Sequence, residues 1–155
     1  MPVYNRRFIT RDTEATPNPQ HLRVTGPRIP VQVALPSAVA KIIEEQEQPI
    51  PPAVAGFALI DTGASISAVD EDIVINLGLH PIDEIEVRTP AGKSIHKVFP
   101  VRFIFEGNPL PEVSLIFAVG CKLQPQGFVV LLGRDLLQSY IFIYNGVLAT
   151  VSLSV

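Results

Sequence analysis

Proline and glycine interrupt this sequence so often that they leave little room for long helices. Fifteen prolines and ten glycines occur in 155 residues. Each proline fixes φ and removes a backbone donor, and glycine favours turns. We therefore predict an all-β, β-rich fold of many short strands with two or three small helices. The length fits one domain around a single core.

Composition and charge narrow the possible partners. Apolar residues make up 47% of the chain and charged residues 17%, which favours a packed interior over disorder. The net charge of −3 and the lack of a basic stripe give no reason to expect nucleic acid. Apolar runs are too short to span a bilayer, and no apolar segment follows Arg6-Arg7 to make a signal peptide. We expect a soluble, cytoplasmic protein without a membrane partner.

The residues that usually bind metals are few and scattered. Cys121 is the single cysteine and cannot form an internal disulfide, which favours a reducing compartment. His21, His80 and His96 lack the spacing of metal ligands, so we predict no metal and no cofactor. We interpret His96 as a solvated strand residue. We interpret Cys121 as a small packed residue, because the sequence places no histidine beside it.

Periodicity and turn signals place the expected elements along the chain. Residues 1–29 are interpreted as an N-terminal arm, with a short strand at 3–9 and a polar, proline-rich stretch at 11–28. Residues 30–155 form the domain, with a helical insertion at 37–52. Ser37 is expected to cap its helix, which runs to about residue 48. Further strands are predicted at 30–35, 57–60, 113–119, 128–132 and 140–144, and a helix at 70–77 that Gly78 ends.

Two hairpins are predicted from turn residues. Residues 82–88 and 94–105 are expected to form the arms of a long hairpin around "TPAGK", with Phe99, Val101, Phe103 and Phe105 on one face. Near the C-terminus, Asn145-Gly146 is a strong hairpin signal. It predicts that residues 147–155 pair with residues 140–144.

One stretch, "FALIDTGASISAVD" at residues 57–70, combines features suited to chemistry. An apolar strand runs into Asp61, and Thr62, Gly63 and a small-residue turn follow. A carboxylate at the end of a buried strand needs compensation, so a catalytic Asp61 is favoured over an ordinary turn aspartate. About seventy residues later, "VVLLGRDLL" is a second apolar strand that closes on a glycine and opens a short helix.

The motifs "ALIDTGAS" and "LLGRDLL" together resemble those of the retropepsin-like aspartic proteases, the single-lobe relatives of retroviral proteases. The resemblance covers about residues 30–155. It implies a closed barrel or sandwich with one or two short helices and a flap hairpin. It also implies that Asp61 is the catalytic residue of an aspartic endopeptidase, supported by Thr62, Gly63 and Ala64.

The resemblance assigns roles to two further segments. The segment beneath the catalytic aspartate would be Leu131, Leu132, Gly133, Arg134 and Asp135, with Asp135 a structural residue in the first turn of its helix. The flap tip that closes on a peptide substrate would be Pro90, Ala91, Gly92 and Lys93. Thr62 would hydrogen-bond to the matching loop of the other half-site.

Some residues depart from the family pattern. Ser65 stands where retroviral enzymes commonly carry the acidic partner of the arginine, so Arg134 is expected to meet Asp70, Glu71 or a partner subunit instead. Lys93 would shape the pocket electrostatically if it faced inward. Ala64 lacks the hydroxyl that pepsin-like enzymes carry at its position, which predicts activity at mildly rather than strongly acidic pH.

The sequence holds one Asp-Thr-Gly motif and therefore one candidate carboxylate. Peptide hydrolysis by carboxylates needs two carboxylates that share a proton. A homodimer with its active site on the two-fold axis would supply both, paired through exposed strands that include "GVLATVSLSV". The alternative is a non-catalytic module of the same fold that dimerises or binds a peptide. The Asp-Thr-Gly stretch also resembles the phosphate-binding turn of actin-like kinases and ATPases, but 155 residues do not hold their two domains.

Overall fold

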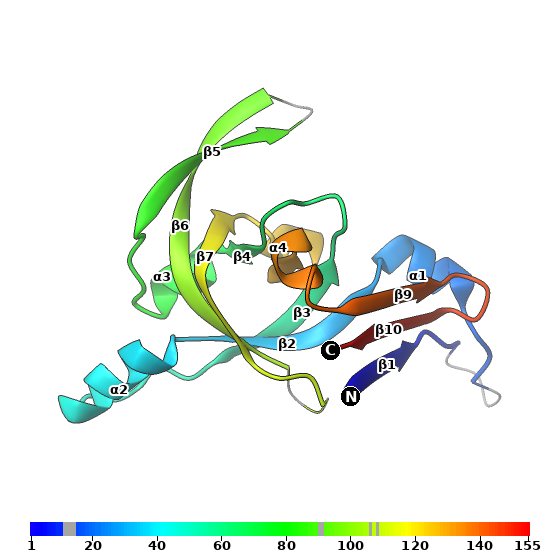
Figure 1. Cartoon of the computed structure of the whole chain (residues 1–155), viewed down its shortest axis with the longest axis horizontal. Coiled ribbons are helices and arrows are strands. Elements are labelled where there is room, and N and C mark those ends of the chain that lie inside the picture. The colour runs from blue at the N-terminus through cyan, green and yellow to red at the C-terminus, as the bar shows by residue number, and fades with distance from the viewer. Residues whose placement is uncertain (11–14, 90–91, 106, 108) are drawn as a thin grey trace.

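The computed structural model describes residues 1–10, 15–89, 92–105, 107 and 109–155, and most of its regular structure is strand (Figure 1). These residues form ten strands, four α-helices and one 3-10 helix. In chain order they are β1 (Val3–Arg7), α1 (Pro19–Thr25), β2 (Arg28–Ala34), α2 (Ser37–Glu45), β3 (Val54–Ile60), β4 (Ala68–Asp70), α3 (Glu71–Asn76), β5 (Asp83–Thr89), β6 (Gly92–Ile104), β7 (Val113–Cys121), η1 (Gln124–Gln126), β8 (Val130–Leu132), α4 (Arg134–Leu137), β9 (Ile141–Asn145) and β10 (Thr150–Ser154). The β-rich fold class is confirmed.

Seven strands form one sheet, in the order β2-β3-β8-β4-β7-β6-β5. An additional pairing of β2 with β6, from Gln32↔Ile104 to Ala34↔Arg102, joins the sheet back on itself. Six strands therefore close into a barrel-like ring, and β5 is attached outside it. Closure removes most of the open edges that a sheet would otherwise expose.

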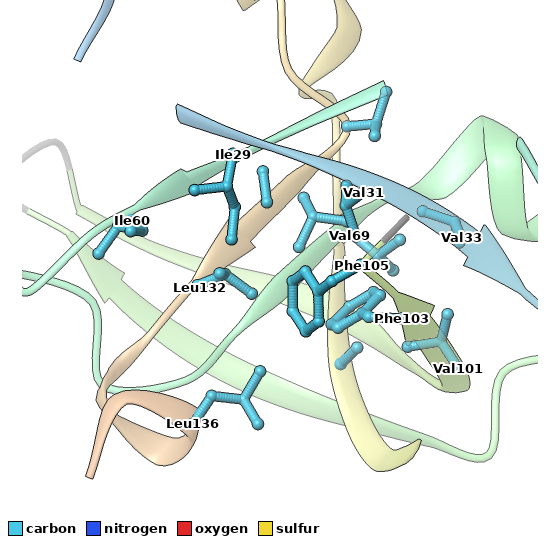
Figure 2. Packing of buried hydrophobic residues seen from close by; sticks show 14 of the residues in the cluster. Ile29, Val31, Val33, Ile60, Val69, Val101, Phe103, Phe105, Leu132 and Leu136 are labelled. Carbon is cyan, nitrogen blue, oxygen red and sulfur yellow. The ribbon is translucent and has the colours of Figure 1, made fainter. Parts of the chain in front are cut away.

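The core fills this ring with side chains that alternate along the strands (Figure 2). On β2, Ile29, Val31 and Val33 are buried, as the period of two requires for a strand with one face inward. The expected apolar face of β6 is confirmed, because Phe99, Val101, Phe103 and the following Phe105 are all buried.

The helices are more numerous than the one or two that the family resemblance implied. α1 lies within the stretch 11–28, which was interpreted as part of an N-terminal arm, and no helix was predicted there. Its start is explained by Asn18, whose Oδ1 accepts from the backbone N–H of His21, and by Pro19 in the first turn. The apolar side chain of Leu22 anchors α1 in the core. The cap at Asn18 and the buried Leu22 explain this helix, which the polar composition of the stretch did not indicate.

The other helices follow their expected positions with corrected ends. Ser37 is the first residue of α2 rather than its cap, because Pro36 occupies the cap position without a side-chain hydrogen bond. The same helix ends at Glu45, earlier than predicted. α3 agrees with the prediction: Asp70 caps it by accepting from the N–H of Ile73, and Gly78 follows its end with a positive φ of 80°.

A separate three-stranded sheet joins the two termini in the order β1-β10-β9. The predicted C-terminal hairpin is confirmed, with Thr150 paired to Asn145 and Ser154 to Ile141. The other side of β10 pairs with β1, from Val3↔Ser154 to Arg7↔Thr150. The expectation that the C-terminal strand offers an edge to a second copy is therefore wrong, because β10 is the central strand of its sheet.

The long hairpin is also confirmed, with β5 and β6 paired from Asp83↔Val98 to Thr89↔Gly92. The backbone pairing of β6 with β7 begins only at Val98↔Val119. The distal half of the hairpin therefore extends beyond the barrel, as Figure 1 shows. Two residues predicted for its tip, Pro90 and Ala91, lie outside the described residues.

Candidate active site

Asp61 follows directly from β3, where that strand runs beside β8. The two strands are parallel, with Ile60 opposite Leu132, and the N–H of Asp61 donates to the carbonyl of Leu132 over 3.0 Å. Its side chain is half-buried. The segment containing Leu131 and Leu132 thus lies next to Asp61. The register of β3 against β8 therefore fixes the backbone of Asp61.

Gly63 fixes one carboxylate oxygen. Its N–H donates to Asp61 Oδ1 over 2.8 Å, and the N–H of Ala64 donates to the carbonyl of Asp61 over 3.3 Å. A Cβ on Gly63 would lie 3.0 Å from the same Oδ1, closer than such contacts usually come. The glycine therefore allows the turn to close onto the carboxylate.

Arg134 holds the Asp61 loop (residues 61–67) from α4. Its Nη1 donates to the carbonyls of Thr62 and Gly63 over 2.7 and 3.0 Å, and its backbone N–H donates to the carbonyl of Ala64 over 3.0 Å. The expectation that Arg134 meets Asp70 or Glu71 is wrong. Without an acidic residue at position 65, the guanidinium binds backbone oxygens, which supply partial negative charge in a fixed geometry.

A hydrogen-bonded pair of Ser67 and Asp135, which the sequence analysis did not identify, completes this support. Ser67 Oγ donates to Asp135 Oδ1 over 2.7 Å and accepts from the N–H of Gly133 over 2.9 Å. The N–H of Ser67 donates to Asp135 Oδ2 over 3.0 Å. Ser67 is fully buried and Asp135 is partly buried, and the hydroxyl of Ser67 links the Asp61 loop to the start of α4. Asp135 lies in the first turn of α4, as expected.

Gly133 has no space for a side chain. A Cβ there would lie 2.6 Å from the carbonyl carbon of Ile66 and 2.8 Å from its oxygen. Its φ of −85° and ψ of 178° are open to any residue, so the requirement for glycine is steric rather than conformational. The Asp61 loop and the end of β8 approach each other backbone to backbone.

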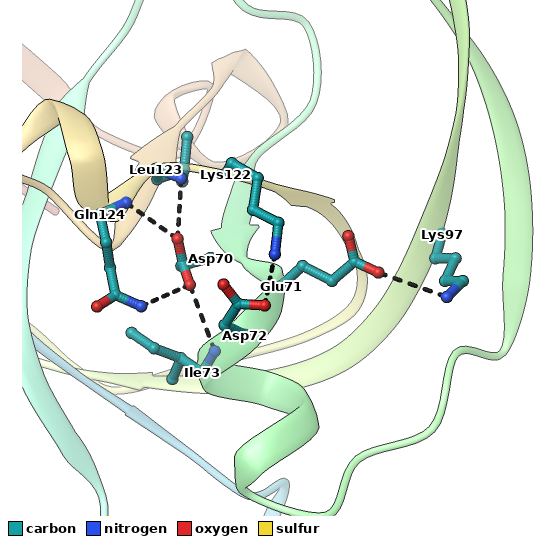
Figure 3. A network of polar contacts seen from close by, with 8 residues as sticks. All are labelled: Asp70, Glu71, Asp72, Ile73, Lys97, Lys122, Leu123 and Gln124. Atoms are coloured by element: carbon teal, nitrogen blue, oxygen red, sulfur yellow. Dashed lines mark hydrogen bonds and ion pairs between the residues drawn. The ribbon is translucent and has the colours of Figure 1, made fainter.

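Asp70 is a second carboxylate near the loop, and its contacts are structural (Figure 3). Its Oδ2 accepts from the N–H groups of Leu123 and Gln124, and its Oδ1 accepts from the Gln124 side chain and the N–H of Ile73. Burial alone would raise the pKa of Asp70, but these donors outweigh it and hold the pKa below its usual range. Asp70 therefore joins β4, α3 and η1 as an ionised group.

Asp61 opens onto a cavity of about 630 Å³ between its loop, the barrel and the hairpin. The apolar part of the wall comes from Ala68, Val119 and Leu131 on the barrel and from Ile85 and Val87 on β5. The last two pack against a small buried cluster that contains Ala68 and Val119. The cavity thus combines the Asp61 carboxylate with an apolar wall, which suits an apolar group of a ligand.

The hairpin also brings charge to this cavity. Glu86 and Arg88 line it, and Glu86 Oε1 lies 3.1 Å from Lys93 Nζ and 3.3 Å from Arg88 Nε. Lys93 therefore pairs with Glu86 along the hairpin. Lys93 is not among the described residues that line the cavity. Glu86 therefore has two cationic partners on the hairpin.

His96 links the hairpin to the barrel beyond the last β6–β7 pair. Its Nδ1 lies 2.9 Å from the carbonyl oxygen of Gly120, and its Nε2 lies 2.7 Å from Ser94 Oγ. The interpretation of His96 as a solvated residue is wrong, because its ring is half-buried and bonded on both sides. The same Nδ1 lies 3.8 Å from Cys121 Sγ. The strand register brings these residues together, and the sequence carried no sign of it.

Cys121 lines the cavity but is not prepared for nucleophilic chemistry. Burial raises the pKa of its thiol, and the nearby carboxylates of Glu71 and Asp70 raise it further. Within the described part of the chain, no three side chains of metal-binding type gather at one place. The described helices are all too short or too polar to cross a membrane.

Comparison with known proteins gives a likeness in fold. No protein-family model and no curated protein matches the chain. The solution structure of simian foamy virus (mac) protease has 16% sequence identity and a TM-score of 0.42, over 70% of this chain and 91% of that one. The crystal structure of a retropepsin-like aspartic protease from Rickettsia conorii has 15% identity and a TM-score of 0.44, over 97% and 92%. The second carries the name of the family that the sequence motifs resemble. These likenesses concern the fold.

Proposed function

We propose that this chain is one half of a homodimeric aspartic endopeptidase, in which Asp61 of each copy contributes one carboxylate. The observation that carries the proposal is the placement of Asp61. Its carboxylate is held by the Gly63 N–H at the end of a core strand and opens onto a large, mostly apolar cavity beside a hairpin. This arrangement suits a group that must keep its position while a peptide binds.

The need for a second copy follows from the chemistry of the cavity. In hydrolysis by a carboxylate pair, one carboxylate activates water while the other protonates or polarises the peptide carbonyl. Glu86 is the other carboxylate among the described lining residues, and two cations already hold it. A two-fold axis near Asp61 would instead bring an identical carboxylate, and the exposed Thr62 would face the partner's loop.

The remaining residues have supporting roles in this proposal. Gly63 orients one oxygen of the carboxylate, and Ala64 lines the cavity next to it. Arg134, Gly133 and Asp135 hold the loop from below. The hairpin tip, including Gly92 and Lys93, would close over an extended peptide, whose apolar side chains would pack on the wall of the cavity.

The test compares cleavage of an unfolded protein and of a fluorogenic peptide library by the wild type and by Asp61→Asn. The variant keeps the size of the side chain but replaces the carboxylate by an amide that cannot titrate. Cleavage should therefore be abolished while the circular dichroism spectrum is unchanged. Asp72→Asn is the matched control, because Asp72 is an exposed carboxylate outside the cavity lining, and its variant should cleave normally. Undiminished cleavage by folded Asp61→Asn would contradict the proposal. Peptide binding without cleavage, unchanged in Asp61→Asn, would instead favour a non-catalytic binding module.

A further inference from the structure

The β5–β6 hairpin leaves the barrel at Gly120, where the backbone pairing of β6 with β7 stops. The last pair is Val98↔Val119, and on its other side β7 pairs with β4, with Val69 opposite Gly120. Gly120 is buried, so its carbonyl oxygen needs a donor from the protein. The Nδ1 of His96 lies 2.9 Å from this oxygen and takes the place of the backbone N–H that would continue the ladder.

The contacts of the His96 imidazole fix where its proton lies. A carbonyl oxygen can only accept, so Nδ1 carries the hydrogen that is donated to Gly120. In the neutral imidazole Nε2 then accepts, and the hydroxyl of Ser94 donates to it over 2.7 Å. The thiol of Cys121, 3.8 Å from Nδ1, therefore faces a nitrogen that already holds a proton and cannot take another from it. The arrangement suits a structural contact and not a cysteine–histidine nucleophile pair.

His96 and Ser94 lie on the face of the hairpin that covers the cavity. In the register of β5 against β6, His96 is opposite Ile85 and Ser94 is opposite Val87. Ile85 and Val87 line the cavity and pack against the small buried cluster on the barrel. Because cross-strand neighbours share one face of a sheet, the contact of His96 with the barrel sets the position of this apolar wall over the cavity.

A second polar contact from this part of β6 is weaker. Lys97 points to the opposite face of β6 and lies 3.5 Å from Glu71, and its side chain is 48% exposed. Ion pairs of this kind contribute little, because water and salt screen them. Loss of the His96 donor would instead leave the buried oxygen of Gly120 without its partner, which is costly. His96 is therefore the stronger polar restraint on the hairpin.

We propose that His96 is a positioning residue that latches the hairpin to the barrel and holds its apolar wall over the cavity. The latch keeps the hairpin near its closed position, so a peptide binds without first having to order it. This inference rests on the proposed function, since a peptide is the ligand that the hairpin would cover. Loss of the latch weakens the binding of substrate and of transition state equally, which raises KM and leaves kcat unchanged.

The experiment uses Cys121, the single cysteine, as a reporter of hairpin opening, because it lines the cavity close to His96. The rate at which its thiol reacts with a small aromatic disulfide is measured for the full chain. His96→Leu removes the donor and should speed this reaction about three- to tenfold, which corresponds to one hydrogen bond. Ile95→Thr is the matched control, because Ile95 is 74% exposed on the opposite face of β6, and it should react like the wild type.

His96→Asn separates a latch from a direct effect of the imidazole on the thiol. An asparagine amide N–H can occupy the place of Nδ1–H and donate to the carbonyl of Gly120, but the ring is gone. The reaction rate of Cys121 should therefore return to within about twofold of the wild-type rate. A rate in His96→Asn as fast as in His96→Leu, or a wild-type rate in His96→Leu, would overturn the inference.

A second measurement does not depend on a substitution. Heteronuclear NMR of the imidazole nitrogens of the wild type is recorded at a pH where the ring of His96 is neutral. The hydrogen should lie on Nδ1, because the carbonyl of Gly120 can only accept. A neutral ring with its hydrogen on Nε2 would overturn the latch.

These outcomes separate the inference from the proposed function. His96→Leu should raise KM for peptide cleavage about three- to tenfold and leave kcat unchanged. If cleavage requires Asp61 but His96→Leu leaves KM unchanged, the positioning role is wrong and the protease assignment stands. If the thiol rates and the NMR spectrum agree with the latch and no cleavage is detected, the latch stands and the protease assignment falls.

Discussion

The hydroxyl of Ser67 is predicted to be one of the most important polar groups for stability in the chain. The substitution Ser67→Ala removes two hydrogen bonds at once, the donation to Asp135 and the acceptance from the Gly133 N–H. The bond to Gly133 is buried and the bond to Asp135 is partly buried, and the Ser67 side chain itself is fully buried. Alanine fits the same space, so the change tests the hydrogen bonds rather than the packing.

The size of the effect follows from the state of the groups left behind. A hydrogen bond to a charged carboxylate contributes about 1.5–3 kcal/mol, and a buried unpaired N–H costs about 1–3 kcal/mol. Asp135 keeps the N–H donors of Ser67 and Leu136, which reduces the loss on its side. We expect the free energy of unfolding to fall by about 3 kcal/mol. For a chain of this length that corresponds to a drop in Tm of roughly 6–12 °C.

The assay is urea unfolding at neutral pH, with Ser152→Ala as the matched control. Ser152 donates its hydroxyl to Asn5 on the exposed face of the terminal sheet, where water replaces the lost partner. Its loss should therefore cost less than about 0.5 kcal/mol. A loss below about 1 kcal/mol for Ser67→Ala would refute the reasoning, because removing a buried hydroxyl that makes two hydrogen bonds should cost more than that.

Two further substitutions test the carboxylate of Asp70 and the close approach at Gly133. The pKa of Asp70 is lowered in the folded chain, so its contribution to stability is present above the unfolded pKa of about 3.9 and is lost as pH falls through the folded value. Asp70→Asn should therefore lower the free energy of unfolding at pH 7 by about 2 kcal/mol. In urea unfolding, the difference between the variant and the wild type should narrow below about pH 4. A difference that stays constant with pH would contradict the stabilising role of the ionised Asp70. Gly133→Ala forces a Cβ against the carbonyl of Ile66 and should cost about 1–3 kcal/mol in thermal unfolding. Gly146→Ala, whose nearest contact would be an ordinary 3.5 Å, should be close to neutral, and equal Tm values for the two variants would argue against the steric account.

The strands and hairpins could be predicted because their signals are local. Alternation along β2 and β6 identified the buried faces, and Asn145-Gly146 located the C-terminal hairpin. The position of Asp61 at a strand end was also local, since an apolar run stops at that residue. Each of these signals lies within about ten residues of the feature it predicts.

The rest of the site depends on contacts between distant segments. Ser67 and Asp135 are 68 residues apart, and His96 meets Gly120 through the register of β6 against β7. A serine in "ASIS" has no local mark that distinguishes it from a solvated turn residue. The position of β10 inside its sheet likewise depends on β1, which comes from the opposite end of the chain.

The Asp61 loop is fixed on one side and open on the other, and this asymmetry is what the proposed half-site requires. From below, Arg134, Asp135 and Gly133 bind the loop through hydrogen bonds to its backbone and to Ser67. On its other side, Thr62 is exposed and Asp61 is only half-buried. Because the lower contacts are all intrachain, the loop does not need a partner to keep its shape. For the proposed homodimer, dissociation on dilution should therefore remove the second carboxylate while leaving the first in position, so the proposed activity should vanish before the fold does.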